Sequence, residues 1–416
     1  MAKKKTYILG GAQTDFARNW AKEGKGVQAL INEVLDDAFS DAKLSPADIE
    51  SIHVGNFAGG LYNMQGHLGA MAVTYSPDFR GLPTARHEAA CASSSIAALA
   101  ARTEIDAELY DCSLVLGVEL MKSVDSKRGG DFLGTAAWYD KEAKGVAFPF
   151  PKLFGRLGDV YEELYGLKYE HLAEISAVNY ENARSNPNAQ TREWYMSKDH
   201  ALSSGSYNMT VGGMIRITDC SQVTDGAVAL FLASEKFATE YAKKNGLSLS
   251  DIPYIEGWGT ATAPILFDDK VTEANEAKSS NSYALPHTRK AITDAYNRAG
   301  INGPDDLDFV ETHDCFTTSE YMAIEHFGLT EPGKAWQAIE NGDIKKDGKL
   351  PFNPSGGLIG AGHPVGATGA RQLLDAHRQL TDRADGYQVE NAKRAATLNI
   401  GGSATTNVVH IVAVDK

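Results

Sequence analysis

The sequence predicts an α/β fold made of two similar layered units with an irregular segment inserted between them. Strand-like and helix-like runs alternate over residues 6–120, and the same order of elements returns in the last third of the chain. In both regions a cysteine stands between a strand-like run and the start of a helix. Such alternation is typical of helices packed on a sheet. The chain has 416 residues, too many for one simple core, so two or three domains are expected.

The first unit begins with a short apolar strand at Thr6–Gly10 and a helix with 3.6-residue apolar spacing at Val27–Ala42. A second strand is expected at Ile52–Gly55. Cys91 comes just before a long Ala-rich helix, and the apolar run Leu114–Val118 is typical of a buried strand.

From about residue 122 to residue 218 the pattern is irregular, with frequent Gly, Pro, Asn and aromatic residues. A long excursion of this kind commonly covers a binding site. Its aromatic residues either line a pocket or pack a core of the excursion itself. They include Phe132, Trp138, Tyr139, Phe148, Phe150, Phe154 and Tyr161.

Regular spacing resumes at Asp225–Leu232, and the last third then repeats the order of the first. The sequence predicts helices at Thr288–Ala299, near Thr318 and near Ala367, and strands at Leu307–Glu311, Ala396–Ile400 and Asn407–Val414. The shared order suggests two similar units that face each other.

Composition and charge exclude several classes of function. Hydrophobic residues make up 43% and charged residues 23% of the chain, as in ordinary globular proteins. The formal net charge of -14 argues against a nucleic-acid-binding surface, and no apolar stretch reaches transmembrane length. The N-terminal residues lack a signal-peptide core, so a cytoplasmic protein is expected. The 4 cysteines lie far apart without a C-x-x-C pair, which argues against a disulfide framework or a structural zinc site.

Cys91 is the first candidate for chemistry. It stands among small residues just before a helix, whose terminal N–H groups and dipole are expected to stabilise a thiolate and lower the thiol pKa. The run Ser93-Ser94-Ser95 fits a helix start, because serine side chains satisfy free N–H groups there. The alternative is a buried cysteine that acts as a small hydrophobe.

Two histidines, a second cysteine and a glycine pair are the other candidates. Cys315 follows His313 by two residues, either by coincidence in a loop or as a thiol that moves protons beside an orienting imidazole. His363 stands next to a proline in the densest glycine cluster, which aims its ring. That cluster lacks the Gly-Lys-Ser/Thr ending of a phosphate-binding loop. Gly401-Gly402 is either a plain turn or the source of a backbone N–H for a developing oxyanion.

Taken in order, these segments resemble the thiolases, and within them the sterol carrier protein type. The Cys91 segment is similar to the nucleophile loop of that family, and Gly362-His363-Pro364-Val365-Gly366 is similar to its most distinctive block. His313-Asp314-Cys315-Phe316 is similar to the motif that marks the subgroup. The resemblance spans residues 10–414. One departure is Asn399, which stands where ordinary thiolases carry a second catalytic cysteine.

The resemblance implies a thiolase-like fold with an α-β-α-β-α five-layer core made of two βαβαβ-type halves. The N-terminal half, at 1–121 and 218–248, would carry the nucleophile. An inserted loop domain at 122–217 would cover the site, and 249–416 would form the C-terminal half.

The resemblance also implies an acyl-CoA C-acyltransferase that works through an acyl group on Cys91. It would cleave a 3-oxoacyl-CoA with coenzyme A, or condense two acyl-CoA molecules, in fatty acid or aromatic acid degradation. His363 would be the base, and Cys315 would take over the role of the missing cysteine. The enolate oxygen would lie at His363 and a water held by His313, and the thioester oxygen at the N–H groups of Cys91 and Gly401. Coenzyme A is the co-substrate, and no metal ion or bound cofactor is expected.

Two other functions stay open at this point. One is a different condensing enzyme of the same fold, such as a ketoacyl synthase or hydroxymethylglutaryl-CoA synthase. The other is a thiolase-like subunit that binds acyl-CoA or lipid without turnover, because fold alone does not guarantee activity. The expected partners are acyl-CoA substrates, coenzyme A, further copies in a homodimer or homotetramer, and a small zinc-containing OB-fold companion subunit. Neither nucleic acid nor a membrane is expected.

Overall fold

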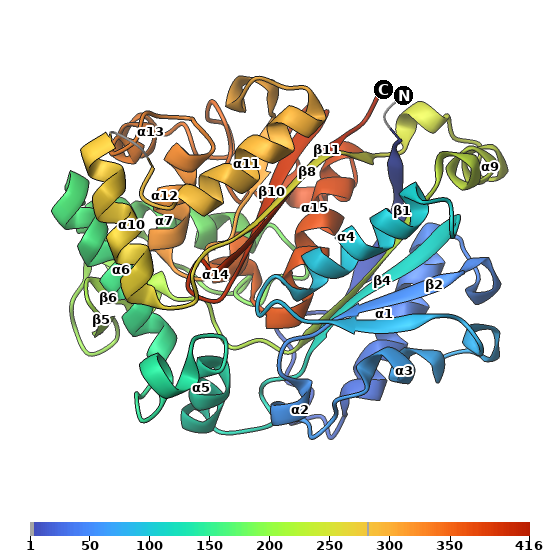
Figure 1. Ribbon diagram of the computed structural model, residues 1–416, viewed down its shortest axis with the longest axis horizontal. Coiled ribbons are helices and arrows are strands. Elements are labelled where there is room, and N and C mark those ends of the chain that lie inside the picture. Colours follow the sequence, from blue (N-terminus) through green and yellow to red (C-terminus); the bar gives the residue numbers. More distant parts are fainter. Residues whose placement is uncertain (1–3, 281–282) are drawn as a thin grey trace.

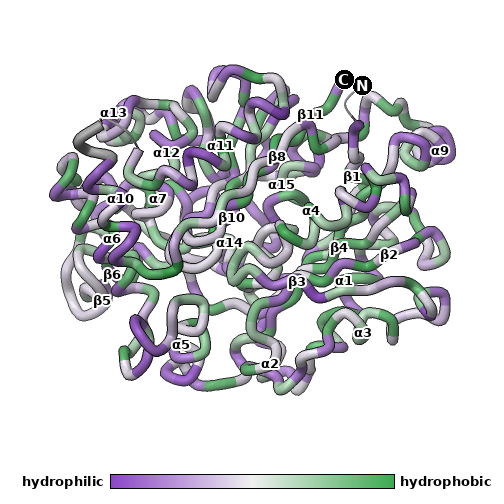
Figure 2. The backbone as a smooth tube through the Cα atoms, viewed as in Figure 1, coloured by the Kyte–Doolittle hydropathy of each residue, from purple (hydrophilic) through white to green (hydrophobic). Residues whose placement is uncertain are grey.

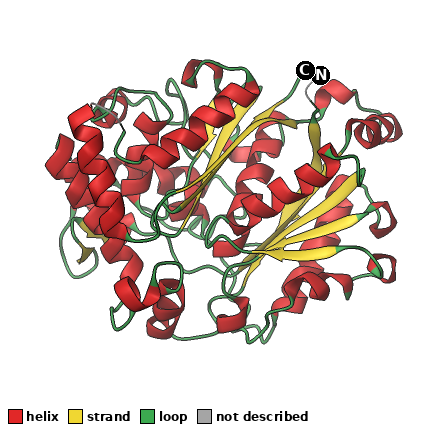
Figure 3. Ribbon diagram, viewed as in Figure 1, coloured by secondary structure: helices red, strands yellow, loops and turns green. Residues whose placement is uncertain are grey.

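The structure is a computed structural model that describes residues 4–280 and 283–416. Its strands are β1 Thr6–Gln13, β2 Ser51–Gly55, β3 Thr84–His87, β4 Cys112–Glu119, β5 Thr210–Gly212, β6 Ile215–Arg216, β7 Gly226–Ala233, β8 Tyr254–Thr262, β9 Phe309–Glu311, β10 Arg394–Gly401 and β11 Thr406–Ala413. Two of them, β5 and β6, form a small sheet of their own. The others form a nine-stranded mixed sheet in the order β3-β2-β4-β7-β1-β8-β11-β10-β9 (Figures 1 and 3).

Helices cover this sheet and fill the space between its two parts (Figure 1). They are α1 Val27–Ala42, α2 Gly59–Tyr62, α3 Leu68–Val73, α4 Ser93–Asp106, α5 Ser126–Gly134, α6 Pro149–Tyr165, α7 Tyr169–Arg184, α8 Lys198–Leu202, α9 Glu235–Asn245, α10 Phe267–Ser280, α11 Pro286–Ala299, α12 Thr317–His326, α13 Ala335–Asn341, α14 Gly357–Ala361 and α15 Thr368–Leu380. None of the helices in the described part of the chain combines the length and the apolar character that crossing a bilayer demands.

The outer helices α1, α3 and α9 pack on the strands of the first part of the sheet. In α1 the apolar residues Leu30, Ile31, Val34, Leu35 and Ala38 recur at helical spacing and are buried against β1 and β7. Figure 2 shows the complementary pattern, with hydrophilic residues along the outward-facing α9.

The central layer consists of α4 and α15, which lie against each other between the two parts of the sheet. Ala97 and Ala101 of α4 and Leu373 of α15 share one core with Val115 of β4 and Val412 of β11. On the far side α11 covers β8 and β11. The order of layers is therefore α-β-α-β-α, and the expected thiolase-like α/β fold class is confirmed.

The strands of the two layered halves belong to one continuous sheet. Thr6 and Tyr7 of β1 pair with Ile255 and Tyr254 of β8, which joins the halves edge to edge. Because only this short stretch connects them, the remaining strands diverge and leave room for α4 and α15 (Figure 3). Most of the pairings are antiparallel, whereas β2 pairs in parallel with β3 and β4, and β10 with β9.

The segment 122–217 forms α5 to α8 and the small sheet of β5 and β6. Leu153, Phe154 and Leu157 of α6 pack into the same core as Met322 and Ile324 of α12. The segment is thus anchored on the second part of the molecule, while the domain boundaries stated above remain a prediction.

Candidate active site

Cys91 lies in a tight turn between β3 and α4. Ala90 has a φ of 51°, in the left-handed region that non-glycine residues seldom adopt, so the backbone is strained directly before the cysteine. The hydroxyl of Ser93 holds this turn from both sides: it donates to the carbonyl of Ala90 at 2.6 Å and accepts the N–H of Ala89 at 3.0 Å. The turn fixes the direction in which the sulfur points.

The expected capping role of the serine triplet is wrong. The helix begins at Ser93 with Ala92 as its cap residue, and no side chain satisfies the free N–H groups. Ser93 holds the turn before the helix, and the other two serines make tertiary contacts. Ser94 accepts the N–H of Ala370 at 2.9 Å, and Ser95 donates to the amide oxygen of Asn399 at 2.9 Å. The hydroxyls of Ser94 and Ser95 connect the nucleophile helix to α15 and β10.

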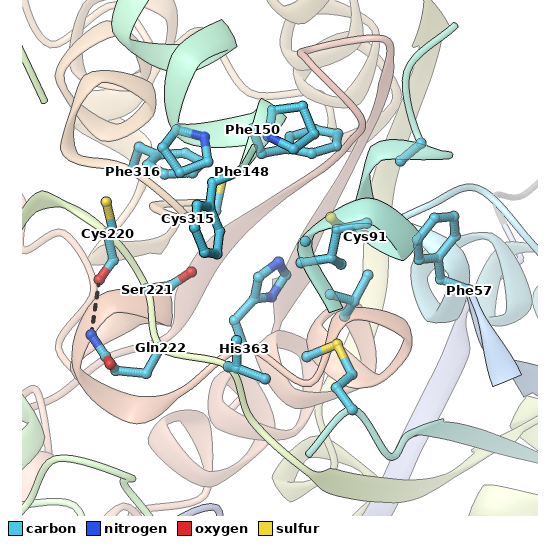
Figure 4. A pocket seen from close by; sticks show the side chains of 18 of the residues that line it. Phe57, Cys91, Phe148, Phe150, Cys220, Ser221, Gln222, Cys315, Phe316 and His363 are labelled. Carbon is cyan, nitrogen blue, oxygen red and sulfur yellow. Dashed lines mark hydrogen bonds between the residues drawn. The ribbon is translucent and has the colours of Figure 1, made fainter. Parts of the chain in front are cut away.

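Cys91, His313 and His363 meet in space although they come from three distant segments. The sulfur of Cys91 and one ring nitrogen of each histidine lie within 4.8 Å of one another. The two imidazole rings are nearly perpendicular, with their centres 5.2 Å apart. Cys315 lies on the wall of the same cavity, and Figure 4 shows Cys91, Cys315 and His363 around one opening. Cys91, Cys315 and His363 therefore line one cavity, and His313 lies beside Cys91 and His363 without being among the lining residues.

The expectation of an acidic Cys91 thiol is also wrong. Burial raises its pKa to about 12, and the nearby carboxyl groups of Glu119 and Glu88 act in the same direction. The N–H groups of Gly402 and of Cys91 itself bond to the sulfur and lower the pKa, but they do not offset the loss of water. Cys91 rests as a neutral thiol.

His363 is a neutral base. Burial is the main cause that lowers its pKa to about 3, and the positive charge of Arg371 adds to it. Its Nδ1 lies 2.7 Å from the hydroxyl oxygen of Thr368, whose own hydroxyl donates to the carbonyl of Pro364 at 3.2 Å. We assign the hydroxyl proton to this carbonyl, so that Nδ1 of His363 carries a proton and donates it. The free lone pair is left on Nε2.

Cys315 and His313 are neutral as well. Burial, followed by the neighbouring Cys91, raises the pKa of the Cys315 thiol well above its usual range. Burial, His363 and Arg371 together lower the pKa of His313 far below its usual range. The site thus contains two thiols that hold their protons and two imidazoles that hold only one proton each.

The glycine pair Gly401-Gly402 lies at the end of β10, and it is Gly402 rather than the expected Gly401 that faces the cavity. Gly402 lines the cavity and bonds to the sulfur of Cys91 through its N–H, whereas Gly401 is not among the lining residues. Gly401 packs directly on the carbonyl of Ala89, and a Cβ there would overlap that oxygen. The sequence pointed to the right turn, and the packing of β10 on the nucleophile loop decides which glycine faces the cavity.

The cavity has a volume of about 210 Å³ and a largely apolar wall. The two alternatives for the aromatic residues each apply to part of the set. Phe148 and Phe150 line the cavity, whereas Phe154 and Tyr161 are buried in the core. Phe132 packs against the same small core as Cys91, Trp138 is exposed, and Tyr139 is partly buried. Residues that the sequence did not single out also line the wall: Phe57, Met121, Cys220, Ser221, Gln222 and Phe316.

Two buried carboxyl groups that the sequence reasoning missed hold the loops of the site. Asp314 accepts the N–H groups of Leu358 and Ile359 at 2.6 and 3.1 Å, which ties the glycine-rich run to the loop of His313. Glu119 accepts the N–H groups of Phe57 and Gly366 at 2.8 and 3.0 Å. Glu119 ends a strand-like run, but nothing local indicates that distant N–H groups converge on it.

Comparisons with known proteins agree with this site. Residues 6–195 match the thiolase N-terminal domain, and residues 270–414 match the thiolase C-terminal domain-like family model. The chain is 32% identical over 406 residues to an acetyl-CoA acetyltransferase of Methanothermobacter thermautotrophicus, with 97% of this chain and 98% of that protein covered. It is 29% identical over 409 residues to human sterol carrier protein 2, with 96% and 70% covered.

Solved structures share the fold over the whole chain. A structure described as "Ltp2-ChsH2(DUF35) aldolase" matches with a TM-score of 0.77 at 20% identity, covering 99% of this chain and 98% of that one. Human mitochondrial 3-ketoacyl-CoA thiolase in complex with CoA matches with a TM-score of 0.70 at 16% identity and the same coverage. Both thiolase domains follow each other along the sequence, and a relative above 30% identity spans nearly its full length. This chain therefore belongs to the thiolase family of acyltransferases.

Proposed function

We propose that the protein catalyses a reaction in this cavity that breaks a carbon–carbon bond of the substrate and forms a carbon–sulfur bond. It cleaves a 3-oxoacyl-CoA with coenzyme A as co-substrate, and in reverse it condenses two acyl-CoA molecules. One observation carries the proposal: a thiol and two imidazoles lie within 4.8 Å at Cys91, His313 and His363, and the second thiol of Cys315 lies on the same wall.

The first step is the attack of Cys91 on the 3-keto carbon. Nε2 of His363 has the free lone pair, and it takes the S–H proton as the sulfur–carbon bond forms. Because both groups are neutral at rest, the proton moves together with the attack rather than before it. The proton received turns Nε2 of His363 into a hydrogen-bond donor.

The second step breaks the bond between carbons 2 and 3 of the substrate. Its electron pair passes to the leaving acyl-CoA as an enolate, and the S–H proton of Cys315 is transferred to carbon 2. The high pKa of the Cys315 thiol keeps this proton in place until the enolate forms. Hydrogen-bond donors at the enolate oxygen lower the barrier, and loss of one such donor commonly costs about 10²–10³ in rate.

The third step returns the enzyme to its resting state. The thiol of coenzyme A gives its proton to the Cys315 thiolate, and its sulfur attacks the thioester carbonyl on Cys91. Cys91 leaves with the proton that His363 held. The N–H groups of Cys91 and Gly402 already point at the sulfur of Cys91, and we assign them to the oxygen of the bound thioester.

Intact-protein mass spectrometry tests this function. After exposure to a panel of acyl-CoA compounds, the wild-type chain should gain the mass of one acyl group, and Cys91→Ala should gain none. Cys112→Ala is the matched control, because Cys112 is a buried cysteine of β4 outside the cavity. Equal labelling of Cys91→Ala and the wild type would remove Cys91 from the mechanism.

The same experiment distinguishes an active thiolase from a subunit that binds acyl-CoA without turnover. A 3-oxoacyl-CoA should acylate Cys91 and release the shorter acyl-CoA in equal amount. Tight binding without release of that product would instead support the binding subunit.

We also propose that the chain works in a homo-oligomer together with a small zinc-containing, OB-fold companion subunit. Support for the companion comes from a structural neighbour whose description pairs Ltp2 with ChsH2(DUF35). Light scattering on the chain purified alone and after co-expression with such a companion tests both points. Cytoplasmic location and a role in fatty acid or aromatic acid degradation remain predictions.

A further inference from the structure

His313 has one ring nitrogen that is satisfied and one that is not. Its Nδ1 lies 3.1 Å from the amide nitrogen of Asn399. Its Nε2 is buried and has no hydrogen-bond partner among the described residues. An amide NH₂ group only donates, so Nδ1 accepts and the single ring proton is on Nε2. His313 thus has an unused N–H donor, and it belongs to the cluster with Cys91 and His363.

Ser95 is the second partner of the amide. Its hydroxyl donates to the amide oxygen of Asn399 at 2.9 Å, and the amide nitrogen faces His313. Because a hydroxyl can also accept, Ser95 would satisfy either orientation of the amide, and it is the orientation seen here that defines the tautomer of His313. If the amide were turned around, its oxygen would face Nδ1 and the ring proton would have to move there. Gly369 of α15 leaves space for this contact, because a Cβ at this position would overlap the Ser95 hydroxyl and lie 2.6 Å from the amide oxygen.

The two histidines of the site therefore rest in opposite tautomers. Thr368 accepts from Nδ1 of His363 and leaves a lone pair on Nε2, whereas Asn399 donates to Nδ1 of His313 and leaves a proton on Nε2. One ring is ready to accept a proton from a thiol. The other is ready to donate a hydrogen bond to an oxygen that becomes negative.

We propose that Asn399, held by Ser95, is a positioning residue that keeps His313 in the Nε2–H tautomer and thereby supplies a direct donor to the enolate oxygen. The inference rests on the proposed function, because this donor matters for a developing oxyanion. It gives a role to the residue that stands where ordinary thiolases carry their second catalytic cysteine. It also replaces the expected His313-held water with the His313 N–H itself.

The tautomer can be read directly in the wild-type protein. ¹⁵N NMR of the resting, ¹⁵N-histidine-labelled protein distinguishes a protonated from an unprotonated ring nitrogen, and His313→Gln identifies the His313 signals by their loss. The expected result is an unprotonated Nδ1 and a protonated Nε2. A proton on Nδ1 would show that the amide lies the other way round, and would overturn the proposal.

Asn399→Asp tests the consequence for catalysis. A carboxylate only accepts, so the ring proton must move to Nδ1, and the neutral ring loses its Nε2 donor. At neutral pH we expect kcat for thiolysis to fall by about 10²-fold or more with KM close to that of the wild type. The groups facing His313 are His363, Arg371 and Cys91. The rate should partly recover at lower pH, where the ring of the variant takes up a second proton and regains the Nε2 donor.

Ser94→Ala is the matched control. Ser94 is also buried on α4, but its hydroxyl accepts from Ala370 and does not touch Asn399. This variant should keep the wild-type His313 signals. An Asn399→Asp variant with wild-type tautomer and kcat would contradict the proposal.

The outcomes separate this inference from the proposed function. The NMR experiment needs no substrate, so a proton on Nδ1 overturns the role of Asn399 even if Cys91 becomes acylated. Failure of Cys91 to acylate, with the proton found on Nε2, overturns the proposed reaction and with it the donor role, while the tautomer assignment stands.

Discussion

At the scale of single residues, the pKa values of Cys91 and His363 decide how the nucleophile is activated. Burial moves the thiol pKa up to about 12 and the imidazole pKa down to about 3, so each group is neutral near pH 7. A preformed thiolate beside an imidazolium would need the opposite order of these pKa values. The strained turn at Ala90 and the fixed tautomer of His363 supply geometry rather than charge.

Alkylation of Cys91 should therefore accelerate steadily with pH. As long as the pH is below the pKa of a thiol, each rise of one pH unit increases the fraction of thiolate about tenfold. We expect the rate of iodoacetamide addition at Cys91, followed by peptide mass spectrometry, to rise from pH 6 to pH 10 without levelling off. A plateau near pH 7 would indicate a preformed ion pair.

Cys315→Ala should separate acyl transfer from carbon–carbon cleavage. We expect thiolysis of a 3-oxoacyl-CoA to fall by about 10²–10⁴-fold, because a positioned acid is lost. Acylation of Cys91 by a simple acyl-CoA should persist. The two activities can be measured by product chromatography and intact mass. Thiolysis at the wild-type rate would show that another group moves the proton.

At the scale of elements, the site depends on how closely α4 and α15 cross in the central layer. Gly369 of α15 lies directly over Ser95 of α4, where a Cβ would overlap the serine hydroxyl. Gly117 of β4 lies over Ala367 in the same way, with 2.6 Å between the would-be Cβ and the Ala367 Cα. Gly369 lets the two helices approach within backbone contact, and Gly117 lets β4 approach the turn that precedes α15.

Gly369→Ala should force these two helices apart. We expect a loss of about 1–3 kcal/mol in the free energy of unfolding, as is usual for overpacking, together with a fall in kcat. Urea denaturation and thiolysis assays measure the two effects. Gly60→Ala is the control, because Gly60 of α2 has open space around its Cα and no left-handed φ. It should be neutral or slightly stabilising, and equal losses in both variants would contradict the role of the crossing.

At the scale of the whole molecule, burial of titratable groups makes the free energy of unfolding depend on pH in two opposing ways. His326 and His410 have their pKa values lowered to about 4 and about 3 by burial, whereas burial raises that of Glu325 to about 7. A histidine whose pKa is lowered in the folded state makes its full contribution to stability above pH 6.5. This contribution is lost as the pH falls, because the unfolded chain takes up the proton. A carboxyl group whose pKa is raised in the folded state makes its full contribution to stability below the pKa that it has in the unfolded chain. This contribution is lost as the pH rises through about 7.

Two variants should therefore change the pH dependence in opposite directions. His410 is buried in β11, and neither ring nitrogen has a hydrogen-bond partner in the described part of the structure. Relative to His410→Leu, the wild type should lose about 1.4 kcal/mol when the pH is lowered from 7.5 to 5.5. Relative to Glu325→Gln, it should gain stability over the same change. Urea denaturation at both pH values checks the signs, and parallel curves for all three proteins would contradict them.

The sequence by itself determined the local elements and the chemistry-bearing residues. The helix predicted at Val27–Ala42 has the same bounds in the structure, and the strands around residues 52–55, 114–118 and 407–414 lie where they were expected. Apolar spacing is a local property, so it can be read without knowing the neighbours. The strand β8 was missed because its Gly257 and Gly259 weaken the strand pattern. These glycines are needed for contact with α11, since a Cβ at either would overlap a carbonyl of that helix.

Only the tertiary structure decided how those residues act. It set the neutral state of Cys91, the choice of Gly402 over Gly401 at the cavity wall, and the contacts of the serine triplet. The partners in question are far apart along the chain: Ser95 and Asn399 are 304 residues apart, and Asn399 and His313 are 86 residues apart. Proton affinity and hydrogen-bond direction depend on which atoms surround a group and on how much water they displace. Those surroundings exist only after the layers have packed.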